Sequence, residues 1–196
     1  MSLRQLFISN HGLCVDMNAE DFREYQREIG VGEVVIEEAV ELFEEANRNN
    51  YTTGYADGVV KAAVMYLAAS KHNEPRTIRE FAEVADESKS IVGKTMFNIR
   101  TQLGIEIEPQ KPEDYVPRIC DAVGASEDHK QAAFAMIQNA RSGDEYLNGS
   151  PNAIAGAAVY DCCPGANHEE VCEESGTLPG TLRNWRKRIN PDSNLS

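Results

Sequence analysis

The sequence predicts an all-α protein made of two tandem five-helix repeats, each of which ends in a helix-turn-helix. Three observations support this fold class. Apolar residues recur at the three- and four-residue spacing of amphipathic helices along most of the 196 residues. No segment shows a convincing alternation of apolar and polar residues of the kind that predicts a β-strand. The same order of apolar positions also occurs twice, which indicates an internal duplication.

The duplication is visible at an offset of 94 residues. Residues 30–33 (GVGE) are matched by residues 124–127 (GASE), and Tyr66 is matched by Tyr160. Later in each copy the offset falls to 90, so that Ile99 is matched by Ile189. Agreement over four successive segments is hard to obtain by chance. We therefore expect an N-terminal tail, two repeats and a C-terminal tail, at residues 1–17, 18–108, 109–190 and 191–196.

Five helices are expected in the first repeat, at residues 19–29, 35–46, 59–69, 77–84 and 90–103. The second of these carries an apolar stripe opposite a row of glutamates. The third is apolar on almost every side, which places it in the middle of a bundle. Thr77 precedes Glu80 by three residues, the spacing of a capping box, and Gly104 follows the last helix as a stop signal.

The second repeat is expected to follow the same order, with helices at residues 113–123, 133–140, 153–163, 168–174 and 179–189. Its third helix is apolar all round except for Asp161. Ser175 and Gly176 form the turn before the last helix. Pro179 lies near the first position of that helix, where its missing N–H costs little. Asn190, followed by a proline, ends it.

The charge of the chain restricts its partners. There are 32 Asp and Glu against 19 Lys and Arg, a net charge of −13. Bulk attraction to nucleic acid is therefore excluded, and DNA could bind only at a local basic patch. The last helix predicts such a patch. Leu182, Trp185 and Ile189 are spaced to face the core, which leaves its polar and basic residues on the other sides.

The candidate DNA-binding residues of the last helix are Thr181, Arg183, Asn184, Arg186 and Lys187. Arg recognises guanine edges and phosphate, Asn recognises adenine or phosphate, and Thr contacts phosphate or a thymine methyl group. In the first repeat, Lys89 and Lys94 lie near a helix start, where they could contact phosphate. The alternative for the last helix is a basic end that balances the helix dipole. The alternative for the two lysines is a solvated surface of mixed charge.

Four short segments carry a resemblance to a known family. Residues 150–160 (SPNAIAGAAVY) are similar to an S-P-x-G-I-A-A-A-A-I-Y stretch, residues 181–184 (TLRN) to T-I-R-N, and residues 92–95 (VGKT) to I-G-R-T. Residues 115–119 (YVPRI) resemble the entry to a second repeat. Together they resemble the paired cyclin-like repeats of archaeal transcription factor B, the relative of eukaryotic transcription factor IIB. The resemblance covers residues 18–190.

This resemblance implies two cyclin-like repeats and the role of a general transcription initiation factor. In the family the repeats straddle promoter DNA bound to the TATA-binding protein. The helix-turn-helix of the second repeat contacts a purine-rich element upstream of the TATA box. The first repeat helps to hold the downstream side and meets RNA polymerase. Arg183 matches the family arginine that contacts bases. The implied partners are promoter DNA, the TATA-binding protein and RNA polymerase.

The sequence departs from the family pattern in three places. No cysteine pair for a zinc ribbon precedes the first repeat, so the resemblance is to the core repeats without that ribbon. Pro179 and Gly180 replace an acidic residue and a base-contacting valine at the start of the last helix. Lys61 interrupts an apolar helix of the first repeat, and we expect it to extend its ammonium to water from an edge.

Neither an enzyme active site nor a metal or cofactor site is predicted. The four histidines and five cysteines show no metal-ligand spacing and no catalytic constellation. The VGKT segment lacks the first glycine and the preceding strand of a phosphate-binding loop. The longest apolar run, residues 62–69, is too short to cross a membrane. The odd number of cysteines favours a reducing cytoplasm.

We therefore expect an archaeal-type cytoplasmic protein that binds promoter DNA with the TATA-binding protein. It would act as a specialised initiation factor, or as a competitor that occupies promoters without loading polymerase. The alternative is a cyclin-fold adaptor that binds proteins and not DNA. A continuous basic strip from the last helix to the first-repeat turn would favour DNA. An isolated basic patch beside an exposed apolar groove would favour the adaptor.

Overall fold

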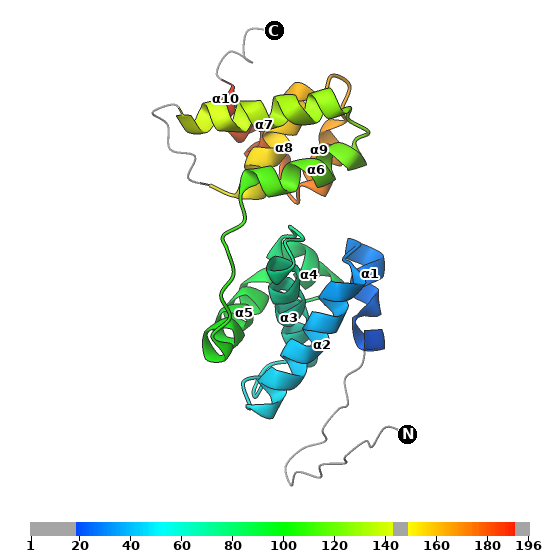
Figure 1. Cartoon of the computed structure of the whole chain (residues 1–196), viewed down its shortest axis with the longest axis vertical. Coiled ribbons are helices and arrows are strands. Elements are labelled where there is room, and N and C mark those ends of the chain that lie inside the picture. Colours follow the sequence, from blue (N-terminus) through cyan, green and yellow to red (C-terminus); the bar gives the residue numbers. More distant parts are fainter. Residues whose placement is uncertain (1–18, 143–148, 191–196) are drawn as a thin grey trace.

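The computed structural model describes residues 19–142 and 149–190, which form two helical bundles stacked along the long axis of the molecule (Figure 1). Within these residues the chain is helical and contains no strand. A single connection, residues 104–111, leads from the first bundle to the second. Each bundle has its own cluster of buried apolar side chains. The predicted all-α class with two successive bundles is therefore confirmed.

The first bundle is arranged around one central helix, α3. Helix α3 packs against α2, α4 and α5, as its nearly all-apolar sequence predicts. The elements are η1 (Ala19–Phe22), α1 (Arg23–Ile29), α2 (Glu33–Arg48), α3 (Asp57–Lys71), α4 (Ile78–Val84) and α5 (Lys89–Leu103). The expected helix at residues 19–29 thus begins as a 3-10 turn before it becomes α-helical.

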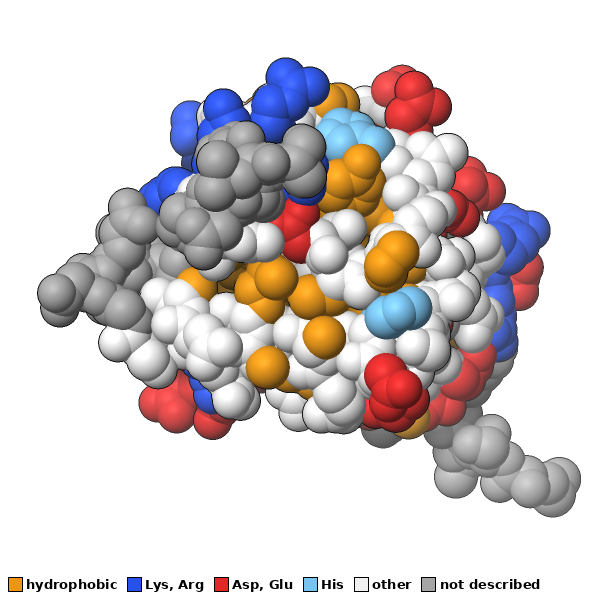
Figure 2. Space-filling view, turned by 90° about the horizontal axis from the view of Figure 1, so that it is seen from above, with side chains coloured by type: hydrophobic (Ala, Val, Ile, Leu, Met, Phe, Trp, Pro, Cys, Tyr) orange, Lys and Arg blue, Asp and Glu red, His pale blue; other side chains and the backbone are white. Residues whose placement is uncertain are grey.

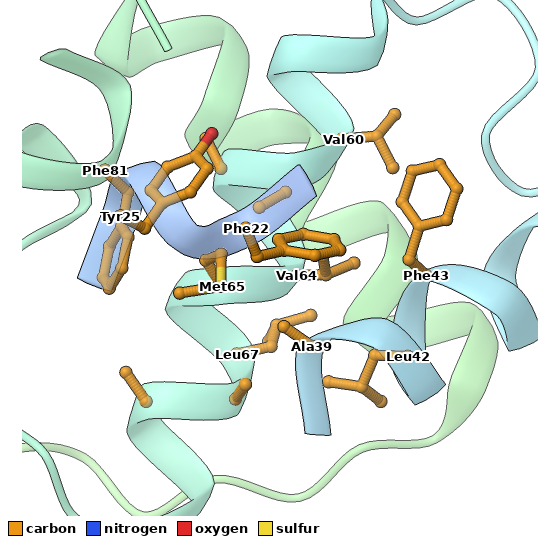
Figure 3. Close-up of a cluster of buried hydrophobic side chains, with 14 of the residues drawn as sticks. Phe22, Tyr25, Ala39, Leu42, Phe43, Val60, Val64, Met65, Leu67 and Phe81 are labelled. Carbon is orange, nitrogen blue, oxygen red and sulfur yellow. The ribbon is translucent and has the colours of Figure 1, made fainter. Parts of the chain in front are cut away.

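The core of the first bundle is built from aromatic and aliphatic side chains of several helices (Figure 3). Phe22 is completely buried, and its ring meets that of Phe43 edge-on at 6.3 Å between centroids. Tyr25 and Phe81 lie beside it, with their ring centroids 6.2 Å apart. Edge-on and tilted arrangements of this kind are favourable for aromatic rings. The short η1 turn is therefore anchored in the core by Phe22.

The second bundle repeats this plan around α8. Helix α8 packs against α6, α7 and α10, and every residue from Asn152 to Val159 is buried. A Cβ atom on Gly156 would lie 2.9 Å from Ser175 and 3.1 Å from Leu182, so the glycine lets α8 approach the helix-turn-helix closely. The elements are α6 (Pro112–Ala122), α7 (Glu127–Ser142), α8 (Pro151–Cys162), α9 (His168–Glu174) and α10 (Pro179–Ile189).

Several local predictions are confirmed at the level of single bonds. Thr77 Oγ1 accepts a hydrogen bond from the Glu80 amide, and a Glu80 carboxylate oxygen accepts one from the Thr77 amide at 2.6 Å. This is the predicted capping box of α4. Gly104 ends α5 with a positive φ of 64°.

The environment of Lys61 differs from the expectation that it extends into water. Its Nζ lies 2.8 Å from a carboxylate oxygen of Asp57, one turn earlier on α3.

The described cysteines are structural thiols. Cys120, Cys163 and Cys172 are buried, Cys162 is partly buried, and all four are unbridged. Burial raises the pKa of Cys120 to about 12, so this thiol stays protonated at neutral pH and is a poor nucleophile. Cys14 lies outside the described residues. None of the helices within these residues is long and apolar enough to span a bilayer.

Candidate nucleic-acid interface

Helix α10 is held on the second bundle by three apolar side chains. Leu182, Trp185 and Ile189 are buried, as their spacing predicts. Pro179 occupies the first turn, where it lacks only a donor that would have no helical partner. A Cβ atom on Gly149 would lie 1.9 Å from the Trp185 ring, so the backbone before α8 packs directly on the indole. The position of α10 is therefore fixed by close packing.

The face of α10 opposite these anchors is cationic and exposed. Arg183, Asn184 and Lys187 lie on it together, because they are spaced by one, three and four residues. Arg183 and Lys187 form no ion pair with any described residue. Figure 2 looks at the second bundle from its outer end, where Lys and Arg side chains gather along one edge and the middle of the surface is mostly uncharged. Three of the predicted site residues therefore share one accessible face.

Arg186 differs from the sequence expectation. Its guanidinium turns sideways toward α8, where it lies 2.5 Å from a carboxylate oxygen of Asp161 and 4.5 Å from the centre of the Tyr160 ring. The Asp161 side chain is only 3% exposed and also accepts a hydrogen bond from Asn190 at 3.2 Å. Arg186, whose side chain is 29% exposed, is thus paired with a buried carboxylate at the side of α10 that faces α8. The sequence could not indicate this, because Asp161 is 25 residues away.

A cavity of about 620 Å³ lies between the two bundles, and candidate residues of both repeats line it. Lys89 of α5 and Thr181 of α10 both line it. Arg76 and Arg79 add positive charge from the first repeat, and Leu178 adds an exposed apolar side chain just before α10. None of the residues that line this cavity is acidic. In a chain with a net charge of −13, this is a locally cationic surface.

The basic residues around the cavity differ in how freely they can bind a ligand. Lys89 forms no ion pair with any described residue. Arg79 is paired with Glu83 on the surface. Arg76 donates to the carbonyl oxygens of Ile29 and Gly30 at 3.2 Å, which caps the end of α1. Burial lowers the pKa of Arg76, but a guanidinium still remains charged at neutral pH.

Lys94 lies one turn beyond Lys89 on α5, and it lines a neighbouring open groove of about 710 Å³ rather than the cavity itself. Ile78 and Lys89 line both hollows. Phe97 forms part of the groove and is 64% exposed, which is unusual for a phenylalanine. Cationic residues therefore extend from the cavity along α5, beside an apolar surface.

A second pocket at the same junction has the opposite charge. Its volume is about 530 Å³. Six glutamates and one arginine, Arg118, line it: Glu24, Glu28, Glu80, Glu83, Glu173 and Glu174. Negatively charged groups are disfavoured at this pocket and favoured at the cationic cavity. The two pockets therefore give the junction a cationic and an acidic side.

Sequence reasoning placed Lys89 and Thr181 in the candidate site but missed the residues that complete the cavity. Leu178 is the clearest example. It lies in the turn before α10 and is 64% exposed. A large apolar residue in a turn next to a candidate recognition helix was the available signal. Arg76 and Arg79 were visible only as part of a nearly neutral stretch of sequence.

Comparison with known proteins agrees with this architecture. Residues 20–101 match the family model described as the transcription factor TFIIB repeat. The chain is 28% identical to transcription initiation factor IIB of Methanothrix thermoacetophila over 171 residues, or 85% of this chain and 51% of that protein. It is 29% identical to the factor of the same name from Archaeoglobus fulgidus over 82% of this chain and 51% of that protein.

A third relative gives a similar match. The chain is 28% identical to transcription initiation factor IIB 7 of Halobacterium salinarum, over 80% of this chain and 50% of that protein. The chain therefore spans about half the length of the curated relatives that it matches.

Proposed function

Because residues 20–101 match the TFIIB repeat model and the chain is 28% identical to an archaeal transcription initiation factor IIB, we propose that it is an initiation factor of this type and that it binds promoter DNA together with the TATA-binding protein. In this proposal α10 lies in the major groove as the recognition helix, and α5 contacts the backbone of the same duplex. The observation that carries the proposal is the cationic cavity, which continues from the start of α10 to Lys89 without an acidic residue. The lining combines Arg76, Arg79 and Lys89 of the first repeat with neutral residues of the second, and positive charge beside the start of α10 supports DNA binding over an adaptor role.

Each candidate residue has a chemical role in this proposal. Arg183 and Asn184 contact base edges, because both present paired hydrogen-bonding groups that fit the major groove. Lys187, Lys89 and Lys94 bind phosphates as point charges. Thr181 lies at the mouth of the cavity and donates its hydroxyl to a phosphate. Arg186 holds α10 against α8 through its pair with Asp161 and does not contact DNA.

A gel-shift titration on a TATA-containing duplex with the TATA-binding protein tests this function. We expect Arg183→Ala to weaken the complex by about 1–3 kcal/mol and to relax base preference, because bidentate base contacts contribute that much. Arg141→Ala is the matched control, since Arg141 is paired with Glu113 on another face of the bundle. If Arg183→Ala and Arg141→Ala bind alike with the same specificity, Arg183 is not a recognition residue.

We propose two regulatory roles that the same reagents can separate. A specialised initiation factor would support transcription from a promoter template with archaeal polymerase. A competitor would bind the promoter with the TATA-binding protein and lower the transcript yield given by a full-length initiation factor IIB. If adding the chain to the template and polymerase produces transcript, it is a specialised initiation factor. If adding it lowers the transcript yield given by a full-length initiation factor IIB, it is a competitor.

A protein-interaction adaptor is the second candidate, and the groove on α5 favours it. Its exposed Phe97 is the kind of apolar side chain that a partner protein buries. An adaptor would lose partner binding in Phe97→Ala and be insensitive to Arg183→Ala. A DNA-binding factor would show the strong effect at Arg183. In the gel shift, a DNA-binding factor gives a promoter complex that Arg183→Ala weakens, whereas an adaptor gives no promoter complex for either substitution to change.

A further inference from the structure

The two repeats meet at a small joint that the candidate residues do not include. From the first repeat, the joint contains the start of α4, residues 76–80. From the second repeat it contains α6 and the turn between α9 and α10. The Tyr115 hydroxyl lies 3.3 Å from the Arg76 carbonyl oxygen, and the side-chain oxygen of Gln110 is its nearer acceptor. A Cβ atom on Gly176 would lie 3.4 Å from Thr77 Oγ1, so the turn before the recognition helix rests against the α4 N-cap.

Arg118 is the residue that bridges all three elements of this joint. It lies on α6, and its side chain is 18% exposed. One terminal nitrogen donates to a Glu80 carboxylate oxygen at 2.6 Å, across the boundary between the repeats. The other donates to the Glu174 carbonyl oxygen at 2.5 Å, at the end of α9. A planar guanidinium fixes the direction of two such bonds at once, which an ammonium cannot do.

Glu80 is held in place from its own side as well. The carboxylate oxygen that does not face Arg118 accepts the Thr77 amide hydrogen in the capping box. Its orientation is therefore set by the first turn of α4 before it meets Arg118. On the other side, the Ser175 carbonyl next to Glu174 accepts a hydrogen bond from Asn152 at 2.6 Å. Both ends of the bridge are thus anchored within their own repeats.

We propose that Arg118 is a positioning residue that fixes the orientation of the two repeats and so holds the start of α10 opposite Lys89. The consequence for DNA rests on the proposed function, whereas the orientation of the repeats does not. With the bridge intact, a duplex meets both repeats in one prearranged geometry. Without it, the repeats sample other orientations, and only the fraction in the matching one binds.

The test measures backbone residual dipolar couplings of the full chain and, in parallel, its affinity for promoter duplex with the TATA-binding protein. In the unmodified chain a single alignment tensor is expected to fit both repeats. In Arg118→Gln the two repeats should need different tensors, and affinity should fall about tenfold if the matching orientation drops to a tenth of the population. Arg118→Lys keeps one of the two bonds and should give a smaller change in both.

Two further variants make the result interpretable. Glu80→Gln keeps an acceptor for the Thr77 amide but removes the charge that faces Arg118, so it should reproduce the separation of tensors without any change in the second repeat. Arg141→Gln removes an exposed arginine–glutamate pair within the second repeat and should leave the couplings and the affinity unchanged. An amide spectrum with unshifted core signals shows that each variant remains folded.

A single tensor in both Arg118→Gln and Glu80→Gln would overturn the proposal. Separate tensors with unchanged DNA affinity would overturn the positioning role in binding. If the unmodified chain binds no promoter complex, the proposed function fails, and the couplings alone then decide whether Arg118 fixes the joint.

Discussion

Arg186 and Lys187 are adjacent residues with the same charge and different environments. Arg186 pairs with an almost fully buried Asp161, whereas Lys187 is exposed and forms no ion pair within the described residues. We expect Arg186→Ala to lower the free energy of unfolding by about 2 kcal/mol, because it leaves a buried carboxylate without its charge partner. Lys187→Ala should change it by less than about 0.5 kcal/mol.

Urea denaturation followed by circular dichroism measures both changes. If the two substitutions lower the free energy of unfolding equally, Arg186 does not hold α10 in place. The sequence-based prediction that Arg186 contacts DNA would then be favoured. This comparison needs no DNA and is independent of the proposed function.

Gly149 and Gly180 provide a second matched pair. A Cβ atom on Gly149 would penetrate the Trp185 ring, whereas one on Gly180 would meet nothing within 4 Å. We expect Gly149→Ala to destabilise the chain by about 1–3 kcal/mol through overpacking. Gly180→Ala should stabilise it by up to about 1 kcal/mol, because alanine favours the helix. Thermal melting of both variants checks the signs, and a shift in the same direction for both would contradict the packing of Trp185.

At the scale of elements, α4 and α5 begin in different ways. Thr77 caps α4 through a reciprocal pair of hydrogen bonds, whereas the Ser88 side chain makes no capping bond to α5. Thr77→Ala should therefore cost about 1 kcal/mol of stability, and Ser88→Ala much less. Equal losses in chemical denaturation would show that the capping box does not contribute.

The helices themselves were largely predictable from sequence, because their signals are local. The capping box at Thr77, the stop at Gly104 and the burial of Leu182 and Trp185 all follow from residues within a few positions of each other. The start of α1 was less well predicted. Residues 19–22 form a 3-10 turn because Phe22 enters the core there, and such a tertiary contact leaves no periodic signal.

The site was predicted less completely than the helices, because it depends on contacts between residues that are far apart in the sequence. Helical periodicity separated the buried side of α10 from its exposed side but could not show that Arg186 has a partner on α8. The bridge from Arg118 to Glu80 and Glu174 joins residues 38 and 56 positions apart. Contacts of that range depend on how the two repeats are placed, which a single sequence does not state.

For the whole molecule, the separation of charge is the feature that the proposed function requires. The chain carries a net charge of −13, yet the cavity between the repeats is lined by cations and neutral residues. Six glutamates gather in the other pocket of the junction. In the proposed function, repulsion from the acidic surface combined with attraction at the cavity orients a duplex as it approaches. DNA binding by this chain should therefore depend strongly on salt.

The salt dependence of promoter binding tests the central claim that cations of both repeats contact one duplex. We would measure it by fluorescence anisotropy, with the TATA-binding protein present, for a triple variant of Lys89→Ala, Lys94→Ala and Lys187→Ala. The control triple variant is Lys61→Ala, Lys71→Ala and Lys130→Ala, whose ammonium groups are paired with carboxylates. The account predicts that the slope of log K against log salt falls by about 3 in magnitude in the first variant and is unchanged in the second. Equal slopes in the unmodified chain and both variants would contradict it.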